Sequence, residues 1–142
     1  MNYSNNEIDY TGAKALVFLH VIDSIKSEGI LYVGNNLDIA YEEGNLLGLK
    51  DFTIERGSFY GWYDNAIGLT SECKAYLEKQ LTEDKYDIQY FIHYAVYQGN
   101  KCIMQVFDGI CIGIDKSIKI PEWLLRECER NKIWISFSDE VK

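Results

Sequence analysis

The sequence predicts an α+β fold for a single domain, residues 1–142, with about three helices and a mostly antiparallel sheet that includes a meander in its C-terminal half. Apolar residues recur at helical spacing over residues 11–27, which indicates an amphipathic helix. Aromatic and β-branched residues gather between residues 87 and 114, interrupted by tight-turn signals. Helices mixed with runs of adjacent strands are typical of this class, and 142 residues can bury one continuous core.

The first helix is expected over Thr11–Ser27. Its inward face is predicted from the three-residue spacing of Leu16, Leu19, Ile22 and Ile25. The apolar run Ile30–Val33 then predicts a strand, and Gly34-Asn35-Asn36 is a turn signal. Because Leu37–Tyr41 alternates apolar and polar residues, it is interpreted as the second arm of a hairpin.

The middle of the chain is the least regular part. Six of the eleven glycines fall between residues 34 and 68, which favours loops and short strands over long helices. A short strand is predicted over Phe52–Glu55. The aromatic stretch Phe59–Asp64 is interpreted as a glycine-flanked loop.

Two further helices are predicted from their start signals. Thr70 or Ser71 can cap a helix that runs to about Leu81. Pro121 suits the first turn of another helix, because the N–H group that proline lacks has no partner there. The side chains expected to face the core from this last helix are Trp123, Leu124 and Cys128.

The C-terminal half carries the clearest strand pattern. Residues 87–98 and 101–107 are expected to pair as antiparallel strands around the turn Gly99-Asn100. Asp108-Gly109 marks a second turn, and alternating isoleucines predict a third strand over residues 110–114. After the last helix, Ile133–Phe137 is expected to form a terminal strand.

Composition excludes several classes of function. The net charge of −8 disfavours a protein that binds nucleic acid through its phosphates. The longest apolar runs are far shorter than the roughly 20 residues that a membrane span needs. The first ten residues do not resemble a secretory leader, and the four cysteines form no CxxC pair. A cytoplasmic protein with reduced thiols, no metal and no cofactor is therefore expected.

The negative charge is unevenly distributed. Residues 1–100 carry 15 acidic and 7 basic side chains, whereas residues 101–142 carry 7 of each, which accounts for all 22 acidic and 14 basic residues. The surplus is either a source of solubility or a docking face for a basic protein or ligand.

Only two histidines are present as catalytic or ligand-binding candidates. His20 and Asp23 are spaced to share one helix face, but His20 lies in an apolar stripe, where a structural histidine is the simpler interpretation. His93 could reach Cys102 across the predicted hairpin as a nucleophile pair. Such thiols usually lie at a loop or a helix start, so this arrangement is disfavoured. Paired carboxylates, phosphate-binding loops and the nucleophile elbow of hydrolases are not recognisable.

Aromatic residues are the most distinctive feature. The chain has eleven tyrosines and three tryptophans, and the 86–97 segment distributes four tyrosines over both strand faces. Core packing accounts for most of these residues. An aromatic loop near surplus carboxylates would also suit a protein interface, since tyrosine and tryptophan bury large areas at low entropic cost.

A small, acidic, aromatic-rich α+β domain without catalytic motifs resembles the immunity proteins of bacterial toxin systems, including those of contact-dependent growth inhibition. This resemblance, which lies in the overall profile of the chain, implies a protein that binds its cognate toxin and blocks the toxin's active site. Many such toxins are basic nucleases, to which an acidic face is complementary. The residues expected to contact the toxin are Asp38, Glu42, Glu43, Glu55, Tyr60, Trp62, Tyr63 and Asp64.

Two alternatives stay open. One is a small enzyme or small-ligand-binding domain with a pocket that contains His20 or His93. The other is a homodimeric structural protein built on the exposed meander.

Overall fold

The computed structural model describes residues 8–26, 28–34, 49–83, 93–107 and 111–139. Within these ranges the elements, in chain order, are α1 (Tyr10–Ser24), β1 (Gly29–Val33), the 3-10 turn η1 (Leu49–Phe52), β2 (Thr53–Phe59), β3 (Tyr63–Gly68), α3 (Ser71–Thr82), β4 (Tyr94–Gln98), β5 (Lys101–Phe107), β6 (Cys111–Asp115), α4 (Glu122–Arg130) and β7 (Ile135–Ser138).

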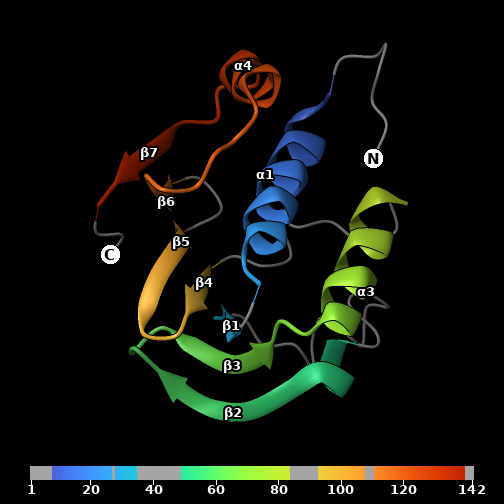
Figure 1. The fold of residues 1–142 in the computed structure, drawn as a ribbon, viewed down its shortest axis with the longest axis vertical. Coiled ribbons are helices and arrows are strands. Elements are labelled where there is room, and N and C mark those ends of the chain that lie inside the picture. The colour runs from blue at the N-terminus through green and yellow to red at the C-terminus, as the bar shows by residue number, and fades with distance from the viewer. Residues whose placement is uncertain (1–7, 27, 35–48, 84–92, 108–110, 140–142) are drawn as a thin grey trace.

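The seven strands form one sheet in the order β2-β3-β1-β4-β5-β6-β7. Every neighbouring pair is antiparallel except β6 and β7, which run parallel and are connected through α4. Figure 1 shows the sheet curving around the three helices, with α1 in the middle and α3 and α4 beside it. The predicted α+β fold with a mostly antiparallel sheet is therefore confirmed.

Helix α1 is the centre of the main core. Its N-cap is Asp9, whose carboxylate accepts a hydrogen bond from the Gly12 N–H at 2.7 Å. The segment from Ala13 to Leu19 is buried throughout, since α1 contacts α3 and α4 and its Phe18 ring meets Tyr94 of β4. A helix that is covered on several sides needs apolar residues around most of its circumference.

Of the predicted strand 87–98, the structure describes β4 over Tyr94–Gln98, and residues 87–92 lie outside the described residues. The other predicted elements that lie within the described residues agree with the structure to within a few residues. The β4–β5–β6 meander is confirmed, with Gly99 at a φ of 59° in the first turn. The N-cap of α3 is Thr70, as predicted, because its hydroxyl accepts from the Cys73 N–H at 3.1 Å. Residues Asp108-Gly109, Tyr86 and Tyr90 lie outside the described residues.

Three predictions need correction or fall outside the structure. The two neighbours of β1 are β3 and β4, while the predicted hairpin arm 37–41 lies outside the described residues. The stretch 59–64 is half turn and half strand: residues 60–62 form the predicted loop, whereas Phe59 ends β2, and Tyr63 and Asp64 begin β3. Trp123 does not face the core: it is 44% exposed, whereas Leu124 and Cys128 on the same helix are buried as expected.

No helix among the described residues is long and apolar enough to cross a membrane.

A buried carboxylate fixes the loop that leaves β6. Asp115 accepts hydrogen bonds from both the N–H and the hydroxyl of Ser117, the former at 3.1 Å, and its other oxygen lies 3.4 Å from the ammonium of Lys101. These contacts outweigh the effect of burial and lower the pKa of Asp115 below its usual value.

The variant Asp115→Asn is expected to lower the free energy of unfolding at neutral pH by about 1 kcal/mol, because the charge-assisted contacts weaken. A lowered folded-state pKa means that the stabilisation is fully present above the unfolded-state pKa of about 3.9 and is lost as the pH falls through the folded-state value. Denaturation at several pH values should therefore show the difference between wild type and variant shrinking only below about pH 4. A difference that stays constant down to acid pH would contradict this role for the charge.

Candidate functional site: an aromatic surface on the sheet

The sheet has a second apolar layer on the face opposite the helices. Because side chains alternate along a strand, Leu31 points toward the helices while Tyr32 points to the other face. Tyr32 lies between Ala66 of β3 and Ala95 of β4 in register. These two small residues leave room on both sides of Tyr32, and the ring of Tyr63 packs with them.

The β2–β3 hairpin reaches over this layer through a tight turn. Tyr60 and Gly61 both have positive φ angles, 54° and 77°, and the Trp62 N–H donates to the Phe59 carbonyl at 3.1 Å. Positive φ at both central positions is the geometry of the type I′ turn that matches the twist of a hairpin. Glycine adopts this conformation freely, whereas a tyrosine in it must be held by its surroundings.

Ring contacts hold Tyr60. Its ring stacks on Tyr97 of β4 with centroids 4.9 Å apart and an interplanar angle of 10°. It also meets Tyr32 edge to face at 5.3 Å. Burial raises the pKa of Tyr97 strongly, so its hydroxyl remains protonated at neutral pH.

Trp62 extends the aromatic layer toward the other end of β4 and β5. The centroid of its ring lies 5.4 Å from that of Phe107 and 6.5 Å from that of His93. The centroids of the His93 and Phe107 rings are 5.7 Å apart. The backbone of Trp62 comes close to β1 because residue 34 is glycine: a Cβ there would lie 2.6 Å from the Trp62 carbonyl oxygen. The β2–β3 hairpin therefore packs closely against the end of β1.

Five side chains in two contacting groups, which the 60–62 turn brings together, form what we call the aromatic surface. Tyr60 and Trp62 are its most exposed members, at 57% and 58%, while the other three are half-buried. The members are Tyr60, Trp62, His93, Tyr97 and Phe107. Tyrosine, tryptophan and phenylalanine rings fixed by neighbours lose little freedom on binding, which is what a protein interface requires.

The structure places five of the eight predicted contact residues. Glu55 and Asp64 are exposed on β2 and β3, and Glu55 pairs in register with Ala66, which puts it on the aromatic face. Tyr60 and Trp62 are exposed as expected. The remaining three, Asp38, Glu42 and Glu43, lie outside the described residues.

Tyr63 is a correction, because it is only 1% exposed and cannot offer its ring to a partner. It supports the surface from beneath, and its hydroxyl accepts a hydrogen bond from the Gln105 amide at 3.3 Å. Sequence reasoning also missed three members of the aromatic surface, namely His93, Tyr97 and Phe107. The alternation of side chains along residues 93–107 indicates only weakly that these three residues share a face of the sheet. Their position beside residues 60–62 depends on the order of the strands in the sheet.

The pair of His93 and Cys102, which the sequence disfavours, is not formed. Cys102 lies opposite Tyr97 in the β4–β5 register, while His93 contacts Trp62 and Phe107 at the other end of the strands. Burial raises the pKa of the Cys102 thiol to about 11. A thiol that is protonated at neutral pH is a poor nucleophile.

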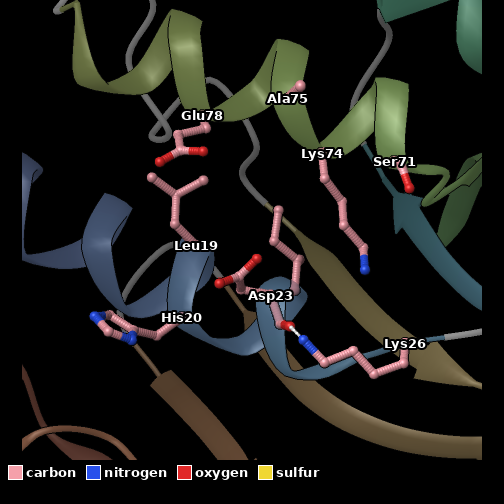
Figure 2. A pocket seen from close by; sticks show the side chains of 9 residues that line it. Leu19, His20, Asp23, Lys26, Ser71, Lys74, Ala75 and Glu78 are labelled. Atoms are coloured by element: carbon pink, nitrogen blue, oxygen red, sulfur yellow. Dashed lines mark hydrogen bonds between the residues drawn. The ribbon is translucent and has the colours of Figure 1, made fainter.

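A concave site, separate from the aromatic surface, lies between α1 and α3. It is a groove of about 400 Å³ lined by Leu19, His20, Ile22, Asp23, Lys26, Ser71, Lys74, Ala75 and Glu78. Figure 2 shows His20 and Glu78 toward one end, Asp23 near the middle, and the two lysines toward the other end.

Backbone carbonyls at the end of α1 engage both lysines. Lys26 donates to the Asp23 carbonyl at 3.0 Å, and Lys74 donates to the Ile25 carbonyl. The groove thus combines the half-buried imidazole of His20 with two carboxylates and with two ammonium groups that already donate hydrogen bonds to backbone carbonyls. Among the described residues no group of three or more His, Cys, Asp and Glu side chains is arranged to hold a metal ion.

No protein-family model, no curated protein and no solved structure matches this chain.

Proposed function

We propose that this protein is an immunity-type binding protein of the bacterial cytoplasm that neutralises a cognate basic toxin domain, a nuclease, by covering its active site. The observation that supports it best is the exposure of Tyr60 and Trp62, 57% and 58%, on a base of packed aromatic rings. Large exposed rings carry an energetic cost in water that a partner removes.

The rigidity of the aromatic surface favours tight binding. The turn conformation and the stacking on Tyr97 hold Tyr60 in place, and the close approach to Gly34 holds the backbone of Trp62. Side chains that are ordered before binding lose little conformational entropy when the partner arrives. Aromatic anchors of this kind dominate the energetics of many protein interfaces.

Charge favours a basic partner. The exposed carboxylates Glu55 and Asp64 lie on the same hairpin as Tyr60 and Trp62, and residues 1–100 contain the whole surplus of eight negative charges, 15 acidic against 7 basic. Such a surface attracts a basic domain over distances of about 10 Å at moderate ionic strength and repels nucleic acid. The same charge complementarity favours binding of this acidic surface to the basic site at which a nuclease holds nucleic acid.

If a gene for a large secreted protein adjoins the gene for this chain, the test is binding of this chain to the C-terminal domain of that protein. Trp62→Ser is expected to raise the dissociation constant at least about tenfold, because it removes a central anchor. The matched control is Trp123→Ser, which removes a 44% exposed tryptophan from α4. Calorimetric titration of both variants against the purified domain is the measurement.

The control variant should bind within about threefold of wild type, since an exposed residue outside the interface contributes little. Equal losses in both variants, or tight binding that survives Trp62→Ser, would rule out the aromatic surface as the contact. Failure of the wild type to bind and to protect cells that express the domain would overturn the proposed function.

The groove between α1 and α3 supports a second candidate function, a small-ligand-binding domain. The specific observation is a concave site that contains His20 together with Asp23 and Glu78. Titration with small ligands separates the two candidates. Saturable binding of a small ligand that His20→Gln loses and Trp62→Ser keeps would assign the function to the groove.

A further inference from the structure

The edge of the sheet at β7 is unlike the edge at β2. Strand β2 carries Glu55 and Arg56 at its centre, whereas residues 133–138 read Ile-Trp-Ile-Ser-Phe-Ser without a charge. Among the described residues β7 has one neighbouring strand, β6. Trp134 is 67% exposed and Phe137 is 42% exposed. Proteins usually protect such an edge with charges, proline or a covering segment.

The backbone groups of β7 that face away from β6 can be identified. The Ser138 carbonyl accepts from the Lys116 N–H at 2.8 Å, so the backbone of Ser138 points toward β6. Residues two apart on a strand point their N–H and C=O groups to the same side, which gives Ser136 the same direction. Ile135 and Phe137 therefore present their N–H and C=O groups at the outer edge.

We propose that β7 pairs antiparallel with β7 of a second copy of this chain, which joins the two sheets into one. A two-fold axis at Ser136 places Ile135 of each copy opposite Phe137 of the other. In this register each pair of Ile135 and Phe137 exchanges two hydrogen bonds. The two outward N–H groups and the two outward C=O groups of each copy therefore all have a partner.

The side chains fit the same register. Ile135 and Phe137 pair with Ile112 and Ile114 of β6, both of which belong to the main core, so all four residues lie on the helix face. The pairing thus forms two cross-strand contacts between an aromatic and a β-branched side chain. A shift of two residues in one direction places Asp139 opposite Ile135. A shift of two residues in the other direction places residue 133, which lies outside β7, opposite Phe137.

A second copy is the occupant because β7 is self-complementary in this register, and the charge near β7 does not oppose the pairing. Each chain carries a net charge of −8, so two copies repel each other over most of their surfaces. Residues 101–142 contain 7 acidic and 7 basic side chains, and the β7 segment itself has none. The β7 edge is therefore in the part of the chain where two copies meet the least electrostatic repulsion.

Sedimentation equilibrium of the purified full chain tests this pairing. Over roughly 1 µM to 1 mM, a range suited to a small interface, the mass is expected to rise from 16.5 kDa to twice that value. Phe137→Lys is expected to raise the dissociation constant of the dimer at least about tenfold, because each copy would place a charge opposite Ile135.

The matched control is Ile54→Lys, which makes a similar change at the 63% exposed residue of the other edge strand. It should dimerise as the wild type does. A wild type that stays monomeric, a dimer that survives Phe137→Lys, or one that Ile54→Lys disrupts equally would each overturn the proposal.

Amide hydrogen exchange gives a second readout that does not depend on a variant that folds. The N–H groups of Ile135 and Phe137 should become protected as the protein concentration rises, while that of Ser136 is protected at all concentrations. Protection of Ile135 and Phe137 that requires a toxin domain and not a higher concentration of this chain would show that the edge takes a strand of the toxin, and the proposal would be wrong. This experiment is independent of the aromatic surface, so either proposal can fail alone.

Discussion

Replacing Phe18 with alanine is expected to lower the free energy of unfolding by about 3–5 kcal/mol. Phe18 is fully buried on α1, and the edge of its ring meets Tyr94 of β4 with centroids 5.5 Å apart and an interplanar angle of 89°. The deletion would leave a cavity between the central helix and a central strand. Because α1 also contacts α3 and α4, it cannot move inward to fill that space without losing other contacts.

Urea denaturation of the two proteins is the measurement, at concentrations below those at which the chain associates. Phe137→Ala serves as the control, because it removes the same ring from a residue that is 42% exposed. That variant should lose no more than about 1 kcal/mol. A loss below about 1 kcal/mol for Phe18→Ala would mean that α1 is not packed on the sheet as the structure shows.

The parts of the fold that could be predicted are those that local sequence specifies. The β4–β5 hairpin follows from Gly99-Asn100, since glycine adopts the positive φ of 59° that this turn needs. The start of α3 follows from Thr70, whose hydroxyl reaches the Cys73 N–H three residues later. In each case the interacting groups are only a few residues apart.

The aromatic surface could be predicted only in part. Tyr60 and Trp62 are close in sequence, and their exposure was expected. His93 and Phe107 join them because β1 lies between β3 and β4, an order that no local pattern encodes. The burial of Tyr63 is hidden from local sequence for the same reason: its ring is covered by β1 and β4 residues far away in the sequence.

Trp123 shows the limit of helical periodicity. The pattern of α4 places Leu124 and Cys128 in the core correctly, and Trp123 adjoins that face. A nine-residue helix at one end of the sheet buries only a narrow stripe. Size and hydrophobicity alone therefore do not decide whether a flanking tryptophan is covered.

Gly34→Ala is expected to lower the free energy of unfolding by about 1–3 kcal/mol and, under the proposed function, to weaken binding to the toxin at the same time. The new Cβ would lie 2.6 Å from the Trp62 carbonyl oxygen and 3.1 Å from the Cβ of His93. Backbone atoms cannot rotate away as a side chain can, so the hairpin or β4 must shift. The hydrogen bond from the Gly34 N–H to the His93 carbonyl, 2.8 Å long, resists the second movement.

The matched control is Gly68→Ala at the end of β3, where the added Cβ would meet only Ile54 Cγ2 at an ordinary 3.7 Å. Its stability should stay within about 0.5 kcal/mol of wild type. Denaturation and toxin affinity measured on both variants then distinguish two effects of the glycine. If Gly34→Ala lost stability but bound the toxin as wild type does, Trp62 would not need its present position, and the aromatic surface would not be the contact. If it lost both, the tight approach at Gly34 would be what positions Trp62 for binding.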